Sequence, residues 1–259
     1  MLRLITIPIS HYCEKARWTL DRAGLDYVEE PHVQALHRIY ARRAGGGLTV
    51  PVLVTPQGAI GDSAEIVAWV DERVAPERRL LGDTPDERAE IEALCRRFDD
   101  GLGPAGRRLI YVHMFAQGKA TTRAFNNQGV PRWEDRALRI GWPLATRFVG
   151  RALAIEPGVE VEDERRVWNE FDHAAELLSD GREYLLGDRF GAADLTFASL
   201  AAPMIVPPIY GVRLPQPDEM DAATADLVKR AREHPAGHWA MELIKRHRRA
   251  TDAYSAVQL

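Results

Sequence analysis

Short apolar runs alternate with amphipathic stretches over the first 75 residues. The apolar runs are short enough to predict β-strands, and they cover Leu2–Ile7, Asp26–Pro31, Val50–Val54 and Ala59–Ile60. The amphipathic stretches predict helices, and they cover Ser10–Ala23, Ala35–Arg43 and Ser63–Val74. In the first helix, Ala16, Leu20 and Ala23 recur at i, i+4 and i+7 and therefore share one face. Gly24 is its stop signal, and Ser63 is the predicted cap of the third helix.

The predicted order is strand, helix, strand, helix, strand, strand, helix. Alternating strands and helices favour a parallel strand pair. The turn Pro56-Gln57-Gly58 between the last two strands favours an antiparallel hairpin beside that pair. Together these features predict a thioredoxin-like α/β domain.

The pattern changes after Ala75-Pro76, where no convincing strand follows. Helical periodicity recurs over Pro85–Leu102, Arg107–Phe115, Asp135–Leu153, Glu162–Ser179, Ala192–Ala202, Ala222–Arg232 and Gly237–Arg249. We therefore expect a thioredoxin-like domain over residues 1–78 and an all-helical domain over 84–259. The polar segment Gln117–Trp133 is broken by Gly, Asn and Pro, which predicts a long excursion between helices.

Composition excludes several classes of protein. The net charge is −4, without the basic excess that nucleic-acid binding requires. No run of ~18 apolar residues is present to span a membrane, and no signal peptide is evident. The two cysteines, Cys13 and Cys95, form no disulfide framework. We expect a soluble, cytoplasmic protein.

The stretch Ser10–Arg17 follows the first strand and begins a helix. A helix N-terminus offers free N–H groups and partial positive charge, which stabilise a thiolate. A hydroxyl at Ser10 could donate a hydrogen bond to such a thiolate, although Ser is also a preferred helix cap. Cys13 would by default be a small buried hydrophobe. We interpret His11 as a solvated turn residue, with electrostatic tuning of a site as its alternative role.

Two further motifs follow, at residues 50–51 and 62–63. Pro51 in Val50-Pro51 begins a strand, where a cis-proline would leave the preceding backbone free to pair with an extended ligand, although trans is the commoner form. Asp62-Ser63 stands at a helix N-terminus, where Ser63 could hold a carboxylate and Asp62 an ammonium group. Helix capping is the competing interpretation.

In order and spacing these motifs resemble the N-terminal domain of the glutathione transferases. Ser10–Arg17 resembles the Ser-x-x-Cys-x-x-x-Arg loop of serine-type bacterial members, Val50-Pro51 the cis-proline element and Asp62-Ser63 the glutathione-binding pair. Tyr184–Leu195 resembles the family's signature before a buried helix. One departure is Gly191, which stands where members have Ser or Thr. Gly lacks the capping oxygen, but Asp194 can still accept a backbone N–H of the preceding loop.

The resemblance implies a homodimeric, detoxifying glutathione transferase, with glutathione as co-substrate. Ser10 would hydrogen-bond the glutathione sulfur, and the thiolate would attack an electrophilic small molecule. The electrophile pocket would lie in the helical domain, near Tyr111, His113 and Phe115.

Two alternatives remain open. In cysteine-type relatives the nucleophilic Cys occupies the position of Ser10, so Cys13 would have to support a thioltransferase or reductase from the less exposed position. The fold could also serve as a non-catalytic binding module.

We expect no metal site, because His234 and His238 are separated by Pro235 and Gly237, which disfavour a regular helix across them, and because His32 and His37 lack other ligands nearby. The basic run Lys245–Arg249 is interpreted as a solvated helix end.

Overall fold

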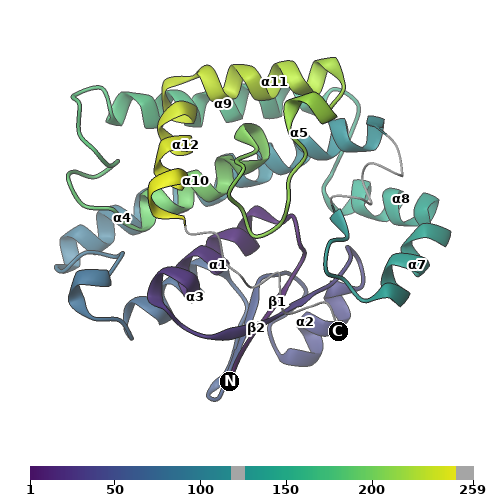
Figure 1. The fold of residues 1–259 in the computed structure, drawn as a ribbon, viewed down its shortest axis with the longest axis horizontal. Coiled ribbons are helices and arrows are strands. Elements are labelled where there is room, and N and C mark those ends of the chain that lie inside the picture. Colours follow the sequence, from purple (N-terminus) through teal and green to yellow (C-terminus); the bar gives the residue numbers. More distant parts are fainter. Residues whose placement is uncertain (118–125, 249–259) are drawn as a thin grey trace.

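The computed structural model describes residues 1–117 and 126–248. The predicted excursion Gln117–Trp133 lies partly outside these residues, as does Arg249 at the end of the last predicted helix. Residues 1–75 form a four-stranded sheet with three helices, seen in the lower part of Figure 1. Its elements are β1 (Leu2–Thr6), α1 (His11–Ala23), β2 (Tyr27–Pro31), α2 (His37–Ala44), β3 (Val52–Thr55), β4 (Gly58–Ile60) and α3 (Ser63–Asp71).

The strands lie in the order β2-β1-β3-β4. β1 pairs parallel with β2 and antiparallel with β3, and β3 forms an antiparallel hairpin with β4. The predicted thioredoxin-like topology is therefore confirmed.

Both faces of the sheet are covered, because side chains alternate across a strand. Leu4 and Leu53 pack on one face with α1 and α3, while Ile5 and Val52 pack on the other with α2. The first of these clusters is completed by Ala16, Leu20, Ile66 and Val70.

The cap of α3 differs from the prediction. The side chain of Asp62, rather than that of Ser63, accepts hydrogen bonds from the backbone N–H groups of Ala64 (2.7 Å) and Glu65 (3.3 Å). Ser63 is instead the first helical residue and is buried. An N-cap residue needs extended dihedrals, and Asp62 has them, with φ −132° and ψ 142°.

Residues 76–248, as far as the structure describes them, form helices joined by loops, with no strand apart from an isolated bridge between Tyr184 and Gly187. After the short turn η1 (Pro76–Arg78), the helices are α4 (Pro85–Asp100), α5 (Leu102–Gln117), α7 (Arg132–Ile140), α8 (Trp142–Ala152), α9 (Val159–Leu177), α10 (Ala192–Ile205), α11 (Ala222–Glu233) and α12 (Pro235–His247), with η2 (Pro217–Glu219) before α11. They stack above the sheet in Figure 1.

Two sequence predictions in this part were wrong. The single helix over Asp135–Leu153 is divided into α7 and α8, because Gly141 ends the first and Pro143 lies in the first turn of the second, where a missing N–H is tolerated. Likewise, α12 does begin across the His234–His238 segment: His234 is its N-cap and Pro235 its first residue, a position that suits proline.

The core of the helical domain surrounds α10, which is buried along almost its whole length. Gly191 contributes no side-chain cap, but Asp194 accepts hydrogen bonds from the backbone N–H groups of Leu185 (2.8 Å) and Gly191 (2.7 Å). The expectation for Asp194 is therefore confirmed. Among the described helices, none is both long and apolar enough to cross a bilayer.

The two parts of the chain meet where α1 packs against α4 and α10. The Tyr12 hydroxyl donates to the carbonyl of Asp99 (2.7 Å), and the buried Lys15 ammonium pairs with the Asp99 carboxylate (2.7 Å). The rings of Trp18 and Phe190 lie 5.8 Å apart. These contacts fix the start of α1 relative to the helical domain.

Candidate functional site

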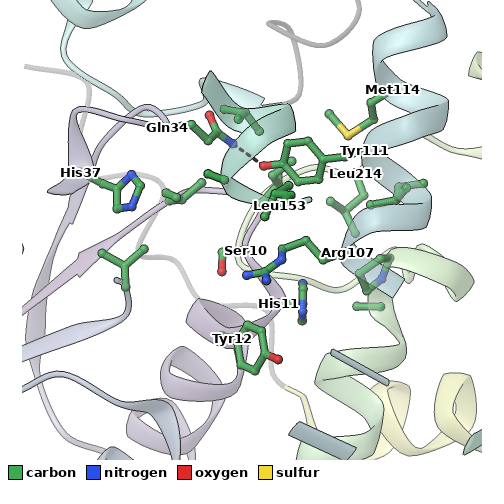
Figure 2. A pocket seen from close by; sticks show the side chains of 18 of the residues that line it. Ser10, His11, Tyr12, Gln34, His37, Arg107, Tyr111, Met114, Leu153 and Leu214 are labelled. Atoms are coloured by element: carbon green, nitrogen blue, oxygen red, sulfur yellow. Dashed lines mark hydrogen bonds between the residues drawn. The ribbon is translucent and has the colours of Figure 1, made fainter. Parts of the chain in front are cut away.

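A cavity of about 290 Å³ lies between the start of α1 and the helical domain. Its wall is mostly apolar, with polar side chains near the start of α1 and along α5 (Figure 2). The N-terminal domain contributes, among others, Ser10, His11, Gln34 and Val50, and the helical domain contributes Arg107, Tyr111, Met114, Phe148, Leu153 and Leu214.

Ser10 is at the same time a helix cap and part of the cavity wall. Its Oγ accepts a hydrogen bond of 3.4 Å from the backbone N–H of Cys13, so it caps α1. The same side chain lines the cavity. Since a hydroxyl has a proton to donate as well as lone pairs, capping leaves the Ser10 O–H available to a ligand.

Arg17, the last residue of the loop motif, has a structural role. Its guanidinium is buried, pairs with Glu29 (2.7 Å) and donates to the carbonyl of Pro8 (3.0 Å). Because Pro8 lies just before Ser10, this contact holds the loop that leads to the cap.

His11 differs from the sequence interpretation. It is only 3% exposed and lines the cavity, so it is not a solvated turn residue. Burial and the nearby Arg107 guanidinium lower the pKa of His11 to about 3, although a hydrogen bond to the backbone of Gly103 opposes this. The imidazole is therefore neutral at neutral pH. Its ring also lies 4.5 Å from that of Tyr12.

Cys13 is completely buried one turn into α1. Burial raises the pKa of its thiol to about 11, despite opposing effects of Arg17 and Ser10. A thiol in this state carries little thiolate at neutral pH, and thiolate is the reactive form of cysteine.

The other N-terminal motifs lie nearby but differ in their relation to the cavity. Val50 lines it, and the Val50–Pro51 peptide bond is cis. The ladder between β1 and β3 begins by pairing Ile5 with Val52, so Val50 lies outside it. Asp62 and Ser63 do not line the cavity, but the Asp62 carboxylate is close enough to Tyr12 to act on the pKa of that phenol.

The three residues predicted to line an electrophile pocket differ in their relation to the cavity. Tyr111 lines the cavity, whereas His113 and Phe115 do not. His113 is hydrogen-bonded to the Thr224 hydroxyl (3.1 Å), and Phe115 packs edge-on against the ring of Tyr111. For His113 the physical reason is helical spacing, because residues 107, 111 and 114 share one face of α5 and residue 113 points away from it.

Several polar residues of the cavity wall were missed by sequence reasoning, Gln34 and Arg107 among them. The Gln34 amide donates to the Tyr111 hydroxyl (2.6 Å) and exchanges hydrogen bonds with the Asn126 amide. Arg107 extends from α5 into the cavity towards the side where Ser10 and His11 lie (Figure 2). The i, i+3, i+4, i+7 spacing of Arg107, Ile110, Tyr111 and Met114 could have revealed this face of α5.

The described residues contain no group of three or more His, Cys, Asp or Glu side chains placed to hold a metal ion. The polar groups of the cavity are hydroxyl, amide, imidazole and guanidinium groups. They suit an organic ligand with anionic and hydrogen-bonding groups.

Known proteins match this chain over part of its length in sequence and over almost all of its length in fold. Residues 4–78 match the family profile described as the N-terminal domain of glutathione S-transferase. None of the curated proteins compared with this sequence matches it.

Solved structures of similar fold cover almost the whole chain. Glutathione transferase F2 from Populus trichocarpa has a TM-score of 0.63 and 17% identity, over 99% of this chain and 97% of that chain. A glutathione S-transferase from Sinorhizobium meliloti 1021 has a TM-score of 0.59 and 20% identity, over 100% of both chains. A glutathione S-transferase from Methylobacillus flagellatus KT, with GSH bound, has a TM-score of 0.60 and 14% identity, over 99% of this chain and 98% of that chain.

The chain therefore has the glutathione transferase fold, and its residues 4–78 match the N-terminal domain of that family.

Proposed function

We propose that the protein binds glutathione and conjugates its thiol to an electrophilic small molecule held in the cavity. The match of residues 4–78 to a glutathione S-transferase domain supports this proposal. So does the fold shared with a relative whose structure has GSH bound.

The position of Ser10 is the observation that carries the proposal. It stands at the N-terminus of α1, lines the cavity and retains a hydroxyl proton after capping the helix. A free thiol has a pKa of ~8.5, and a donor together with a helix N-terminus lowers such a pKa by about one to two units. The interpretation of Ser10 as a cap and its interpretation as a thiol activator are therefore compatible.

Glutathione would lie along the N-terminal domain. The backbone of Val50, beside Pro51, would pair with the extended tripeptide. At the N-terminus of α3, Asp62 would pair with the γ-glutamyl ammonium group, and Ser63 would hold its carboxylate. The exposed carboxylate of Asp62 keeps lone pairs that the helix does not use.

The reaction would begin when the bound thiol releases its proton to solvent. The thiolate, accepting the Ser10 hydrogen bond, then forms a sulfur–carbon bond with the electrophile. In a substitution the leaving group departs with its electron pair, and in an addition the carbanion formed takes up a proton from water. The role of the cavity is to hold the electrophilic carbon near the sulfur.

The first experiment is calorimetric titration with glutathione, followed by mass spectrometry of the products formed with a panel of electrophiles. The proposal predicts binding and a covalent glutathione adduct. A protein that does not bind millimolar glutathione is instead a non-catalytic member of this fold.

Substitution of Cys13 separates conjugation from the redox alternative. Cys13→Ala removes a buried thiol that is poorly ionised, so conjugation should persist with kcat/KM within about threefold of wild type. The thioltransferase alternative would be favoured by two results together. Wild type would show no conjugation, and Cys13→Ala would lose the ability to exchange thiols with a mixed-disulfide substrate.

The proposal also includes a homodimer and a cytoplasmic location, which only the family resemblance implies. Sedimentation equilibrium tests the first: a mass of twice the 29.0 kDa chain is expected.

A further inference from the structure

The charged groups of the cavity are of one sign. Two guanidinium groups, those of Arg38 and Arg107, belong to its wall, and among the described residues no Asp or Glu does. The imidazoles of His11 and His37 also line the cavity. They add no charge at neutral pH, because burial lowers the pKa of His11 to about 3 and that of His37 to about 4. The cavity is therefore apolar and cationic.

Arg107 is half-buried and, unlike the buried Arg17 and Arg248, has no anionic partner among the described residues. Within the described part of the chain, it forms no ion pair or hydrogen bond, and its Nε is buried without an acceptor. Its neighbour in sequence, Arg108, pairs with the buried carboxylate of Asp163. Buried polar groups are normally hydrogen-bonded. Arg22 and Arg79 also have a buried Nε without a partner, but of these three described arginines only Arg107 lines the cavity, where a ligand could reach its guanidinium.

The surroundings of Arg107 compensate its charge only weakly. Its guanidinium carbon lies 5.9 Å from the centroid of the Tyr12 ring, near the outer limit of a cation–π contact. The Tyr12 hydroxyl donates to the Asp99 carbonyl, and no hydrogen bond joins it to Arg107. The Arg107 charge acts on the pKa values of His11, Tyr12 and Tyr111, and none of these groups is an anion at neutral pH.

A second buried polar atom without a partner belongs to a residue of the cavity wall. Nε2 of His11 is buried without a hydrogen-bond partner among the described residues, and His11 lines the cavity beside Arg107. Figure 2 shows the guanidinium and the imidazole together, on the side of the cavity where Ser10 lies. A neutral imidazole has only one N–H, so the N–H donors on this side of the cavity come mainly from the guanidinium of Arg107.

The group that fits is a carboxylate. The guanidinium presents parallel N–H donors that match the two oxygens of a carboxylate, and an apolar wall strengthens such a charge-assisted pair. The γ-glutamyl carboxylate of glutathione is expected elsewhere, at Ser63, and the backbone of Val50 is expected to pair with the tripeptide. Arg107 projects instead from α5, which belongs to the helical domain.

We propose that the electrophile is an organic acid whose carboxylate binds Arg107, which holds the electrophilic carbon beside the sulfur activated by Ser10. This inference rests on the proposed transferase function. Arg107 is then the specificity-determining residue of the second substrate. Arg38, whose guanidinium lies 5.3 Å from the centroid of the Phe148 ring, is not assigned this role.

A matched pair of electrophiles tests the proposal. One is a chloronitrobenzoate with chlorine para to the carboxylate and ortho to the nitro group, and the other is the corresponding benzamide. In both, the thiolate sulfur bonds to the ring carbon and chloride leaves with the bonding pair. Each kcat/KM is divided by the rate constant of the uncatalysed reaction with glutathione, which removes the difference in intrinsic reactivity.

For wild type, the ratio of kcat/KM to the uncatalysed rate constant should be higher for the benzoate than for the benzamide. Arg107→Gln should lower kcat/KM for the benzoate about 10- to 100-fold, the range for loss of a charged hydrogen-bonded pair, and change the benzamide less than about threefold. Arg107→Lys should recover part of the benzoate activity, because Lys keeps the charge but not the planar fork. Arg38→Gln should change both substrates by the same factor.

Equal losses for benzoate and benzamide in Arg107→Gln would overturn the proposal, since Arg107 would then act on the glutathione sulfur or on folding. Calorimetry with unreactive nitrobenzoate and nitrobenzamide separates this failure from failure of the transferase function. If nitrobenzoate binds tightly through Arg107 but neither electrophile is conjugated, the proposed transferase function is contradicted. The proposal that Arg107 binds a carboxylate is then retained. If both electrophiles are conjugated and the two unreactive ligands bind equally well, only the proposal that Arg107 binds a carboxylate is contradicted.

Discussion

At the scale of single residues, the environment of His11 differs most from what its neighbours in the sequence predict. It follows a capping serine in a loop, yet it is buried and neutral because α5 covers it from a part of the chain about 90 residues later. A helix start can be predicted from a local motif, whereas burial at that start depends on distant residues. Sequence reasoning could identify the motifs at Ser10, Val50-Pro51 and Asp62-Ser63, because each of them is defined by local backbone chemistry and not by distant residues.

The neutral state of His11 predicts a pH dependence of stability. Its pKa of about 3 in the folded protein lies below the ordinary value of 6.5. Below pH 6.5 the unfolded chain therefore binds a proton that the folded protein does not, so the free energy of unfolding falls as the pH falls towards 3. The slope from this residue is at most about 1.4 kcal/mol per pH unit.

His11→Gln isolates this contribution from that of other groups. Urea unfolding of both proteins between pH 4 and 7 should show the variant gaining stability relative to wild type as the pH decreases. A difference in unfolding free energy that does not depend on pH would mean that His11 titrates normally in the folded protein.

At the scale of elements, the site depends on how closely α5 approaches α1. Gly103 makes the approach possible: a Cβ at this position would overlap the Tyr12 hydroxyl and lie 2.7 Å from its ring carbon Cζ. The ring cannot retreat easily, because its hydroxyl donates to Asp99. This packing brings Arg107 and Tyr111, one and two turns further along α5, to the cavity.

Gly103→Ala should therefore destabilise the protein by about 1–3 kcal/mol, the usual range for overpacking. Gly150→Ala in α8 is the matched control. Nothing lies within 4 Å of a Cβ there, so better helix propensity should stabilise the protein by about 0.5–1 kcal/mol. Thermal unfolding of the two variants is the measurement, and similar shifts in both would contradict the close approach.

Prediction from sequence was most successful for elements with simple periodicity and a clear cap. The strands and helices of the first 75 residues lie within a few residues of their predicted positions. The division between α7 and α8 was missed because the apolar pattern continues through Gly141 and Pro143, although proline fits within a first turn. The choice of Asp62 over Ser63 as cap depends on the backbone angles of one residue, and both residue types are good caps.

At the scale of the whole molecule, the end of the described chain is bound to its beginning. Arg248 donates to the carboxylates of Glu14 (2.7 Å) and Asp21 (2.6 Å) on α1, and only 3% of it is exposed. The interpretation of Lys245–Arg249 as a solvated helix end is therefore wrong at Arg248. Burial alone would raise the pKa of Glu14, but Arg248 and Arg17 hold it below its ordinary value.

Arg248→Met should lower the free energy of unfolding by about 3 kcal/mol, because removing one partner leaves buried carboxylates with too few cations. Lys245→Met is the control: its side chain is 74% exposed and pairs with Glu242 at the surface, so the change should be close to zero. Denaturant unfolding is the measurement. If both variants lower the free energy of unfolding by equal, small amounts, the buried ion pairs of Arg248 do not stabilise the contact between α1 and the end of the described chain.

The central claim is that Ser10 activates the thiol of glutathione bound beside α1, and the pKa of that thiol is its most direct test. The measurement is the pH dependence of the thiolate ultraviolet absorbance in the complexes of wild type, Ser10→Ala and Ser10→Thr, with glutathione binding measured separately. We predict that wild type lowers the thiol pKa by about one to two units from ~8.5. Ser10→Thr should largely retain this shift, and Ser10→Ala should lose it while still binding glutathione. An unchanged thiol pKa in Ser10→Ala would contradict the claim.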